Sequence, residues 1–422
     1  KTPISFKNRQ KKEHNFHTQI NGNIQANELI TLCNCLLVRT ESIGGSLSKL
    51  TYKIKYIFLN AHLKKVSALK INTINITYPY LSSFFDGYNF FQKDYENQTE
   101  RISKSKPIQI SENFEIVIID EYYRQYSNKD RSFKMEHSKT LEFQYKNTES
   151  FNTVLNHCKS FSKLLAFNTK KKIGFKLNHI TVLNDEIENS QKDSVINSDG
   201  YYCEVINFNN NENLRNTKDF INQNKMYFSK YDTTDEDLKT LIKKWFNNND
   251  FIPIYDFYID SDDWFQENDI IVSNVMFNNK FLNLIQGLES YYDILDVEFI
   301  RNNDVFTKNR QKIVNKIEDK ELEKWFLENL KFPKNPSLSY KLEHLILELK
   351  GIDINLSQFE RFLKNYPNTA KDYRHKLSHG RIKNTYQGIE FERVYHFSKV
   401  LLCFNILRTL GFDKIQLKNI LK

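Results

Sequence analysis

The sequence predicts an α+β protein in which a β-rich N-terminal domain, residues 1–233, precedes an all-α helical bundle, residues 234–422. Two observations lead to this fold class. The 422 residues exceed the roughly 250 that one hydrophobic core usually serves, so we expect the chain to divide. β-branched and aromatic residues dominate the first half, often at every second position, whereas the second half has apolar residues at helical spacing.

Six segments of the first half are expected to be strands because they are rich in Ile, Val, Phe and Tyr and several alternate between apolar and polar residues. They are "ELITLCNCLLV" (28–38), "TYKIKYIFLN" (51–60), "ALKINTINITY" (68–78), "FEIVIID" (114–120), "TLEFQY" (140–145) and "KIGFKLNHITVL" (172–183). Helical spacing over 149–166 predicts a helix between the last two. The polar, Asn-rich residues 188–219 predict an extended loop with one short strand at 201–208.

The second half reads as helical from the stretch "YDTTDEDLKTLIKKWF", which places Thr and Asp before an apolar stripe, as helix starts do. Helices are expected over 235–247, 278–301, 309–329, 339–350, 356–365, 368–378 and 388–410. Together they predict a helical bundle.

Composition indicates a globular protein, with 40% hydrophobic and 27% charged residues. No stretch approaches the roughly 18 consecutive apolar residues of a membrane helix, and the first residues lack a hydrophobic signal core. We therefore expect a cytoplasmic location and no membrane partner. The cysteines are Cys33, Cys35, Cys158, Cys203 and Cys403, with a single C-x-C pair, so we expect buried or free thiols and no four-ligand zinc site.

Positive charge is concentrated near the C-terminus. The net charge is +9, and residues Arg361–Lys422 hold 13 Lys and Arg against 4 Asp and Glu, which accounts for all of it. Such a local basic field suits a polyanion such as nucleic acid, and a solvated cationic face is the alternative interpretation.

Within that segment, "AKDYRHKLSHGRIKN" (370–384) places Arg374 five residues before His379, with His375 directly after the arginine. Five helical steps separate the two side chains by roughly 140°, so one chain pairs them poorly, whereas two copies meeting along this helix could bring them into one groove. An imidazole can move a proton and a guanidinium can stabilise charge on a phosphate, which suits cleavage of RNA by its own 2′-hydroxyl without a metal. The sequence therefore predicts a catalytic site of Arg374 and His379, together with the adjacent His375, in a homodimer.

Structural interpretations of the same residues stay open. Arg374 could pair with Glu289, and His379 could be a cation at a helix end. His375 and His379 share a helical face and could bind zinc, although no third ligand is near in the sequence. The cations Lys376, Arg381 and Lys383 would face solvent or meet RNA phosphates, and Tyr373 and Tyr386 would stack on bases or belong to the core.

Three sets of residues resemble a known family. The motif "RHKLSH" (374–379) in a helical bundle, followed by a helix ending "LLCFNILRTLGF", is similar to the HEPN superfamily. "FLNLIQGLESYY" (281–292) resembles the first long HEPN helix, with Glu289 inside it. "NGNIQANELITLCNCLL", "TYKIKYIFLNAHL" and "INITYPYLSSFF" resemble the N-terminal domain of ApeA-type HEPN proteins. His375 stands where many members carry Asn.

The resemblance implies an anti-phage (abortive infection) endoribonuclease that acts as a homodimer on RNA, with tRNA anticodon loops as substrate. It also implies that the N-terminal domain senses a phage trigger or restrains the nuclease, and that Glu289 supports Arg374. No cofactor is expected. The rival hypotheses are a catalytically inactive HEPN bundle that binds RNA or mediates assembly, and a zinc enzyme built on His375 and His379.

Overall fold

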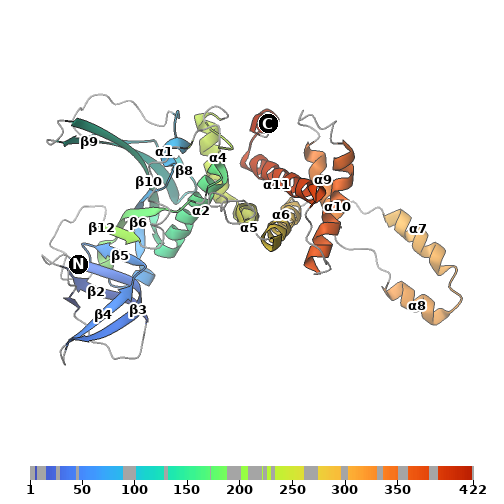
Figure 1. The fold of residues 1–422 in the computed structure, drawn as a ribbon, viewed down its shortest axis with the longest axis horizontal. Helices are drawn as coiled ribbons and strands as arrows, with labels where there is room; N and C mark the ends of the chain where they lie inside the picture. Colours follow the sequence, from blue (N-terminus) through green and yellow to red (C-terminus); the bar gives the residue numbers. More distant parts are fainter. Residues whose placement is uncertain are drawn as a thin grey trace. The chain divides into compact units, whose positions relative to one another are not determined.

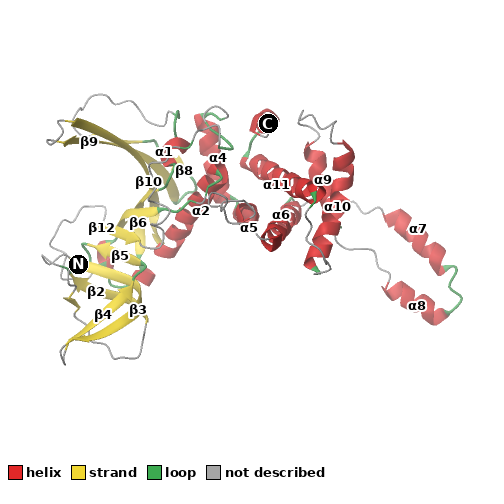
Figure 2. Ribbon diagram, in the orientation of Figure 1, coloured by secondary structure: helices red, strands yellow, loops and turns green. Residues whose placement is uncertain are grey.

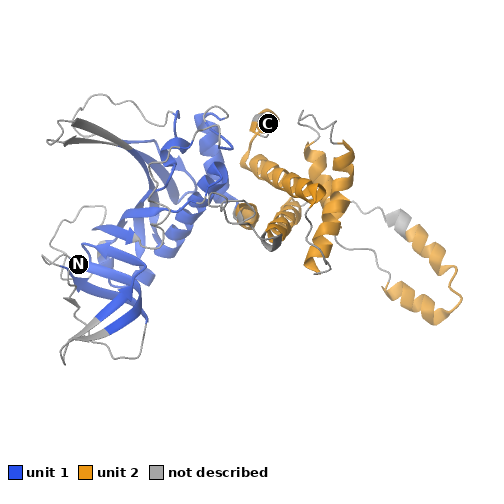
Figure 3. Ribbon diagram, in the orientation of Figure 1, with its two compact units in different colours: residues 1–249 blue, residues 250–422 orange. Residues whose placement is uncertain are grey.

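The computed structural model describes residues 5–6, 16–24, 29–43, 47–88, 101–127, 132–171, 173–187, 201–207, 221, 226–229, 233–260, 274–295, 303–329, 336–349, 360–379 and 388–420 (Figure 1). The chain forms two compact units, Lys1–Asn249 and Asp250–Lys422 (Figure 3). The first is built on a β-sheet and the second is helical, as Figure 2 shows. The predicted α+β class is confirmed.

The described strands of the first unit form one antiparallel sheet. They are β1 (Ser5–Phe6), β2 (Phe16–Asn23), β3 (Leu29–Ile43), β4 (Leu47–Lys53), β5 (Tyr56–Leu59), β6 (Lys70–Thr77), β7 (Arg101–Lys104), β8 (Ile108–Gln109), β9 (Phe114–Ser127), β10 (Ser132–Ser150), β11 (Lys176–Val182) and β12 (Tyr201–Asn207). The order is β1-β2-β3-β5-β12-β11-β6-β10-β9-β7, with β4 on β3 and β8 on β9. Each expected strand is present, although the segment expected at 51–60 divides between β4 and β5.

One face of the sheet is apolar where Ile74 and Ile76 of β6 lie beside Leu141, Phe143 and Tyr145 of β10, because alternate side chains of a strand point to the same face. Phe143 of β10 lies opposite Ile74 of β6, and both are fully buried. Helix α2 (Phe151–Thr169) packs on these two strands, and its Phe161 ring lies 6.3 Å from that of Phe143. The helix begins after Ser150, whose hydroxyl accepts a hydrogen bond from the Thr153 backbone N–H. This layer is the core of the unit.

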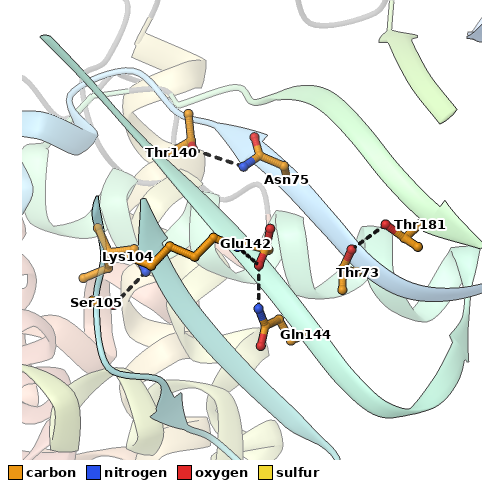
Figure 4. A network of polar contacts seen from close by, with 9 residues as sticks. Thr73, Asn75, Lys104, Ser105, Thr140, Glu142, Gln144 and Thr181 are labelled. Carbon is orange, nitrogen blue, oxygen red and sulfur yellow. Dashed lines mark hydrogen bonds and ion pairs between the residues drawn. The ribbon is translucent and has the colours of Figure 1, made fainter. Parts of the chain in front are cut away.

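The other face of the same strands is polar, and its side chains are paired across strands (Figure 4). Thr73 of β6 donates to Thr181 of β11 at 2.9 Å, and Asn75 of β6 donates to Thr140 of β10 at 3.1 Å. The Glu142 carboxylate, on β10, accepts hydrogen bonds from Lys104 of β7 and from Gln144. Cross-strand pairs of this kind satisfy polar groups that lie deep in a sheet, which explains why Asn75 and Glu142 are tolerated at buried positions.

The described part of this unit also contains α1 (Leu81–Phe84) and α4 (Asp235–Asn247). Helix α1 follows β6, and α4 begins at the residue that the sequence predicts. Thr234 and Asp237 form a capping box at the start of α4. Trp245 is buried and its indole N–H donates to the Ser160 carbonyl at 2.9 Å, which anchors α4 to α2.

The second unit is a bundle centred on α6, which contacts α5, α9, α10 and α11. Its helices are α5 (Ile252–Asp260), α6 (Asn274–Ile294), α7 (Asn303–Val314), α8 (Lys320–Asn329), α9 (Leu338–Leu349), α10 (Glu360–Ser378), α11 (Ile389–Leu410) and α12 (Lys414–Ile420). Polar pairs tie the helices together inside the apolar core. Tyr291 of α6 bonds Thr409 of α11 at 3.0 Å, and Tyr366 of α10 bonds Ser398 of α11 at 2.7 Å.

Two helix predictions need correction. The single helix expected at 309–329 is a pair, α7 and α8, because Asp319 ends the turn between them and accepts the backbone N–H groups of Glu321 and Leu322. The expected break between 365 and 368 is absent, since α10 continues through the buried Pro367. Proline has no backbone N–H, so the helix loses one hydrogen bond at this position. The apolar packing of this face of α10 therefore stabilises the helix by more than the lost hydrogen bond costs. Residues 351–359, where a helix start was expected, lie outside the described residues.

All five cysteines are free and buried, as the sequence predicts. None of the described helices is long and apolar enough to cross a lipid bilayer.

Candidate active site

The C-terminal half of α10 carries the predicted catalytic residues. Tyr366, Ala370 and Tyr373 are buried at spacings of four and three, so they form the face that packs on the bundle. Arg374, directly after the last of them, begins the exposed side of the helix. The helix ends at Ser378, and the His379 N–H donates to the His375 carbonyl at 3.2 Å, which closes the final turn. Buried aromatic residues thus fix the backbone from which the polar residues project.

Arg374 is held by Glu289 of α6. Its Nη2 atom lies 3.4 Å from the Glu289 Oε2 atom, and the two side chains are 46% and 24% exposed. Half-exposed ion pairs contribute about 0–1 kcal/mol to stability, because water screens the charges and ordering two long side chains costs entropy. The contact therefore matters more for the direction of the guanidinium than for the stability of the bundle.

The two histidines lie beside each other. Their ring centroids are 4.5 Å apart at 59°, and both side chains are exposed. No hydrogen bond or ion pair among the described residues joins Arg374 to either ring. One chain therefore presents two separate pairs at this helix end, Arg374 with Glu289 and His375 with His379.

Tyr373 lies on the buried face of α10, where it packs against neighbouring helices and is not available to stack on bases. Its ring packs edge-on against Phe391 of α11 at 5.0 Å and Phe281 of α6 at 6.4 Å. Its hydroxyl donates to the Glu390 carboxylate at 3.5 Å. Of the two interpretations of Tyr373, a place in the core is confirmed and base stacking is contradicted, since only 7% of the residue is exposed. Glu390 was missed by sequence reasoning, because nothing in the sequence links it to Tyr373.

The surrounding cations are described only in part. Lys376 is exposed on the last turn of α10, where positive charge is favourable next to the helix C-terminus. Arg381, Lys383 and Tyr386 lie outside the described residues. Within the part of the chain that the structure describes, no group of three or more His, Cys, Asp or Glu side chains could hold a metal ion.

Comparison with protein families identifies both halves of the chain. A model of "ApeA N-terminal domain 1" matches residues 3–245, more than half of the chain, and a model of "Apea-like HEPN" matches residues 282–416. Glu289, Arg374, His375 and His379 all lie within the second match. No curated protein and no solved structure matches the chain. An antiparallel sheet followed by a helical bundle, with both family matches in that order, shows that the chain belongs to the ApeA-type HEPN family.

Proposed function

We propose that this chain is a metal-independent endoribonuclease that cleaves RNA as an effector of anti-phage defence. The observation that carries the proposal is the presentation of Arg374, His375 and His379 on the exposed end of one helix, inside the segment that matches Apea-like HEPN. HEPN domains are commonly ribonucleases, bind RNA and form dimers, and family membership suggests an anti-phage role.

In the proposed reaction His379 takes the proton from a ribose 2′-hydroxyl, and the 2′-oxygen then attacks the adjacent phosphorus. Arg374 stabilises the negative charge that builds on the phosphate oxygens. The bond from phosphorus to the 5′-oxygen breaks, and that oxygen takes a proton from a protonated imidazole. This imidazole belongs to His375 or to His379 of the second copy. The products are a 2′,3′-cyclic phosphate and a 5′-hydroxyl. DNA is not a substrate because it lacks the nucleophile.

The geometry of one chain favours a site shared by two. Arg374 contacts Glu289 and not His379, and the two residues leave the helix roughly 140° apart. A second copy related by a two-fold axis would supply its own arginine and histidine to the same groove. We therefore propose a homodimer through the helical unit, in which Glu289 orients Arg374.

The finer assignments follow from the family resemblance and belong to the same proposal. The substrate is RNA, with the anticodon loop of tRNA as the target, and Lys376, Arg381 and Lys383 contact its phosphates. The sheet unit, Lys1–Asn249, which includes α4, is the regulatory domain and responds to a phage trigger, and the helical unit, Asp250–Lys422, is the nuclease. The reaction takes place in the cytoplasm and needs no cofactor.

The test compares purified Arg374→Ala and His379→Ala proteins with the parent on total tRNA. Both side chains are exposed, so the variants should unfold at the parental temperature while cleavage is abolished. Lys364→Ala removes an exposed cation from the same helix and is the matched control, which should cut at the parental rate. Parental rates in both site variants would show that the assignment is wrong.

Two further readouts separate the alternatives. Sequencing of fragment ends should find 2′,3′-cyclic phosphates, whereas 5′-phosphates would indicate attack by water. Activity should survive EDTA, and its loss would favour the zinc hypothesis. RNA binding without cleavage by the parental protein would favour the inactive bundle. Mixing the two alanine variants should restore part of the activity if the groove is shared.

A further inference from the structure

The helical hairpin of α7 and α8 has an apolar surface that no other described part of the chain covers. The ten-residue helix α8 has no buried side chain, although it contains Leu322, Trp325 and Phe326. These three positions fall within about 100° around the helix and form one stripe. Trp325 is 60% exposed and Leu322 is 52% exposed, and Ile313 of α7 is 46% exposed. Such a stripe on a short helix is unusual, because helices of this length depend on packing for stability.

The hairpin is nevertheless a well-formed element. A five-residue turn, 315–319, joins the two helices, and their main contacts are with each other (Figure 1). The Lys316 and Ile317 N–H groups donate to the carbonyls of Ile313 and Val314, which closes the end of α7. Arg310 Nη2 donates to the Leu327 carbonyl at 2.6 Å and ties α7 to the far end of α8. The exposed stripe therefore belongs to an ordered pair of helices.

Charge is divided between the two helices. Helix α7 carries three cations and one carboxylate, and the turn after it adds Lys316. Helix α8, taken with the turn residues Glu318 and Asp319, carries five carboxylates and two lysines. When two such hairpins meet about a two-fold axis, with the helices in alternating order around a four-helix bundle, each α7 lies between its own α8 and the α8 of the other copy. The basic helix then faces an acidic helix on both sides, while the apolar stripes meet in the centre.

We propose that the α7–α8 hairpin is an assembly surface for a second copy of this chain, which pairs two hairpins into an antiparallel four-helix bundle. Self-pairing fits the observations better than an unrelated partner, because the surface supplies both the basic and the acidic side of the contact. The contact is separate from the proposed nuclease groove, since none of its residues lies on α10. It can therefore be tested without measuring cleavage.

The first experiment measures the dissociation constant of the full chain by sedimentation equilibrium. Trp325→Glu and Leu322→Glu should each raise it at least about tenfold, equivalent to about 1.4 kcal/mol. Both side chains are exposed, so circular dichroism and the melting temperature should stay parental. Ile415→Glu is the matched control, because Ile415 is 74% exposed on α12 and should leave the dissociation constant unchanged. A parental dissociation constant in both α8 variants would overturn the proposal.

The second experiment reverses charge on one helix at a time. The triple variant Lys308→Glu, Lys312→Glu and Lys316→Glu makes both helices acidic, and the triple variant Glu321→Lys, Glu323→Lys and Glu328→Lys makes both basic. Each protein alone should associate more weakly than the parent, and a mixture of differently tagged chains should form mixed dimers in preference to either homodimer. Failure of the mixture to favour mixed dimers would show that the hairpins do not meet. Arg374→Ala should assemble normally, so loss of catalysis and loss of assembly are distinguishable.

Discussion

Replacement of Gly287 by alanine should weaken the helical unit, although alanine is the better helix former. Gly287 lies on α6 where that helix meets α11 and α5. A Cβ atom added there would lie 2.8 Å from Cδ2 of Leu402 and 3.2 Å from Cβ of Phe257. Leu402 is fully buried, so in a close-packed core its side chain can move aside only by displacing its own neighbours, and the Cβ atom of Phe257 moves only with its backbone.

Two opposing contributions set the magnitude. Alanine in a helix interior is favoured over glycine by about 1 kcal/mol, whereas extra atoms in a packed core cost about 1–3 kcal/mol. A contact below 3.0 Å places Gly287→Ala at the upper end of that cost, so the free energy of unfolding should fall by about 1–2 kcal/mol. For a unit of this size the melting temperature should then drop by roughly 2–8 °C.

Calorimetry of the full chain, with circular dichroism at 222 nm to identify the helical transition, measures the change. Gly388→Ser is the control, because a Cβ at this N-cap of α11 meets nothing within 4 Å and serine caps helices well, so stability should be unchanged or slightly higher. In a Leu402→Ala background most of the steric cost should vanish. A higher melting temperature for Gly287→Ala in the parent, or the same loss in the Leu402→Ala background, would refute the reasoning.

Three further outcomes are expected. Glu289→Gln should slow RNA cleavage while changing the free energy of unfolding by less than about 0.5 kcal/mol, because its ion pair with Arg374 is half-exposed. If the variant unfolds and cleaves RNA as the parent does, Glu289 is not part of the site. Burial lowers the pKa of His157 from its ordinary value near 6.5. Below about pH 6.5 the histidine is therefore protonated more readily in the unfolded chain than in the folded chain. The sheet unit should lose stability as the pH falls below about 6.5. Urea unfolding at pH 7.5 and 5.5 should show this, with a smaller pH effect in His157→Gln. Burial also raises the pKa of Cys35 to about 11, and all cysteines are buried, so Ellman's reagent should react slowly until urea is added; rapid reaction of the native protein would contradict the burial.

The sequence predicts local features of this chain well where one pattern dominates. Helix α4 begins and ends at the predicted residues because a capping box and an apolar stripe coincide there. The break between α7 and α8 was missed, since the apolar spacing continues across Asp319 and hides the cap. The predicted break between 365 and 368 was wrong, because α10 continues through Pro367, which is buried against the bundle.

Long-range placement is harder to read from the sequence. The strand neighbours β5 and β12 come from distant segments, and neither segment contains a signal for the other. At the site, Arg374, His375 and His379 were found from their residue types and spacing, and the pairing of Arg374 with Glu289 was considered from the family resemblance. The anchoring of Tyr373 by Phe281, Phe391 and Glu390 required the structure, because side-chain burial at a helix end depends on the neighbouring helices.

The strand order of the sheet also constrains how the protein is made. Strand β12 pairs with β5 through residues about 145 positions apart, such as Leu59 and Glu204, so the centre of the sheet cannot close until residue 207 has left the ribosome. The helix that carries Arg374 begins at Glu360, 153 residues after the end of β12 at Asn207. At about 5–20 residues per second these residues take roughly 8–30 s to synthesise, longer than the milliseconds to seconds in which β-rich domains usually fold. Each new chain therefore has time to complete its β-sheet unit before the helix that carries Arg374 emerges.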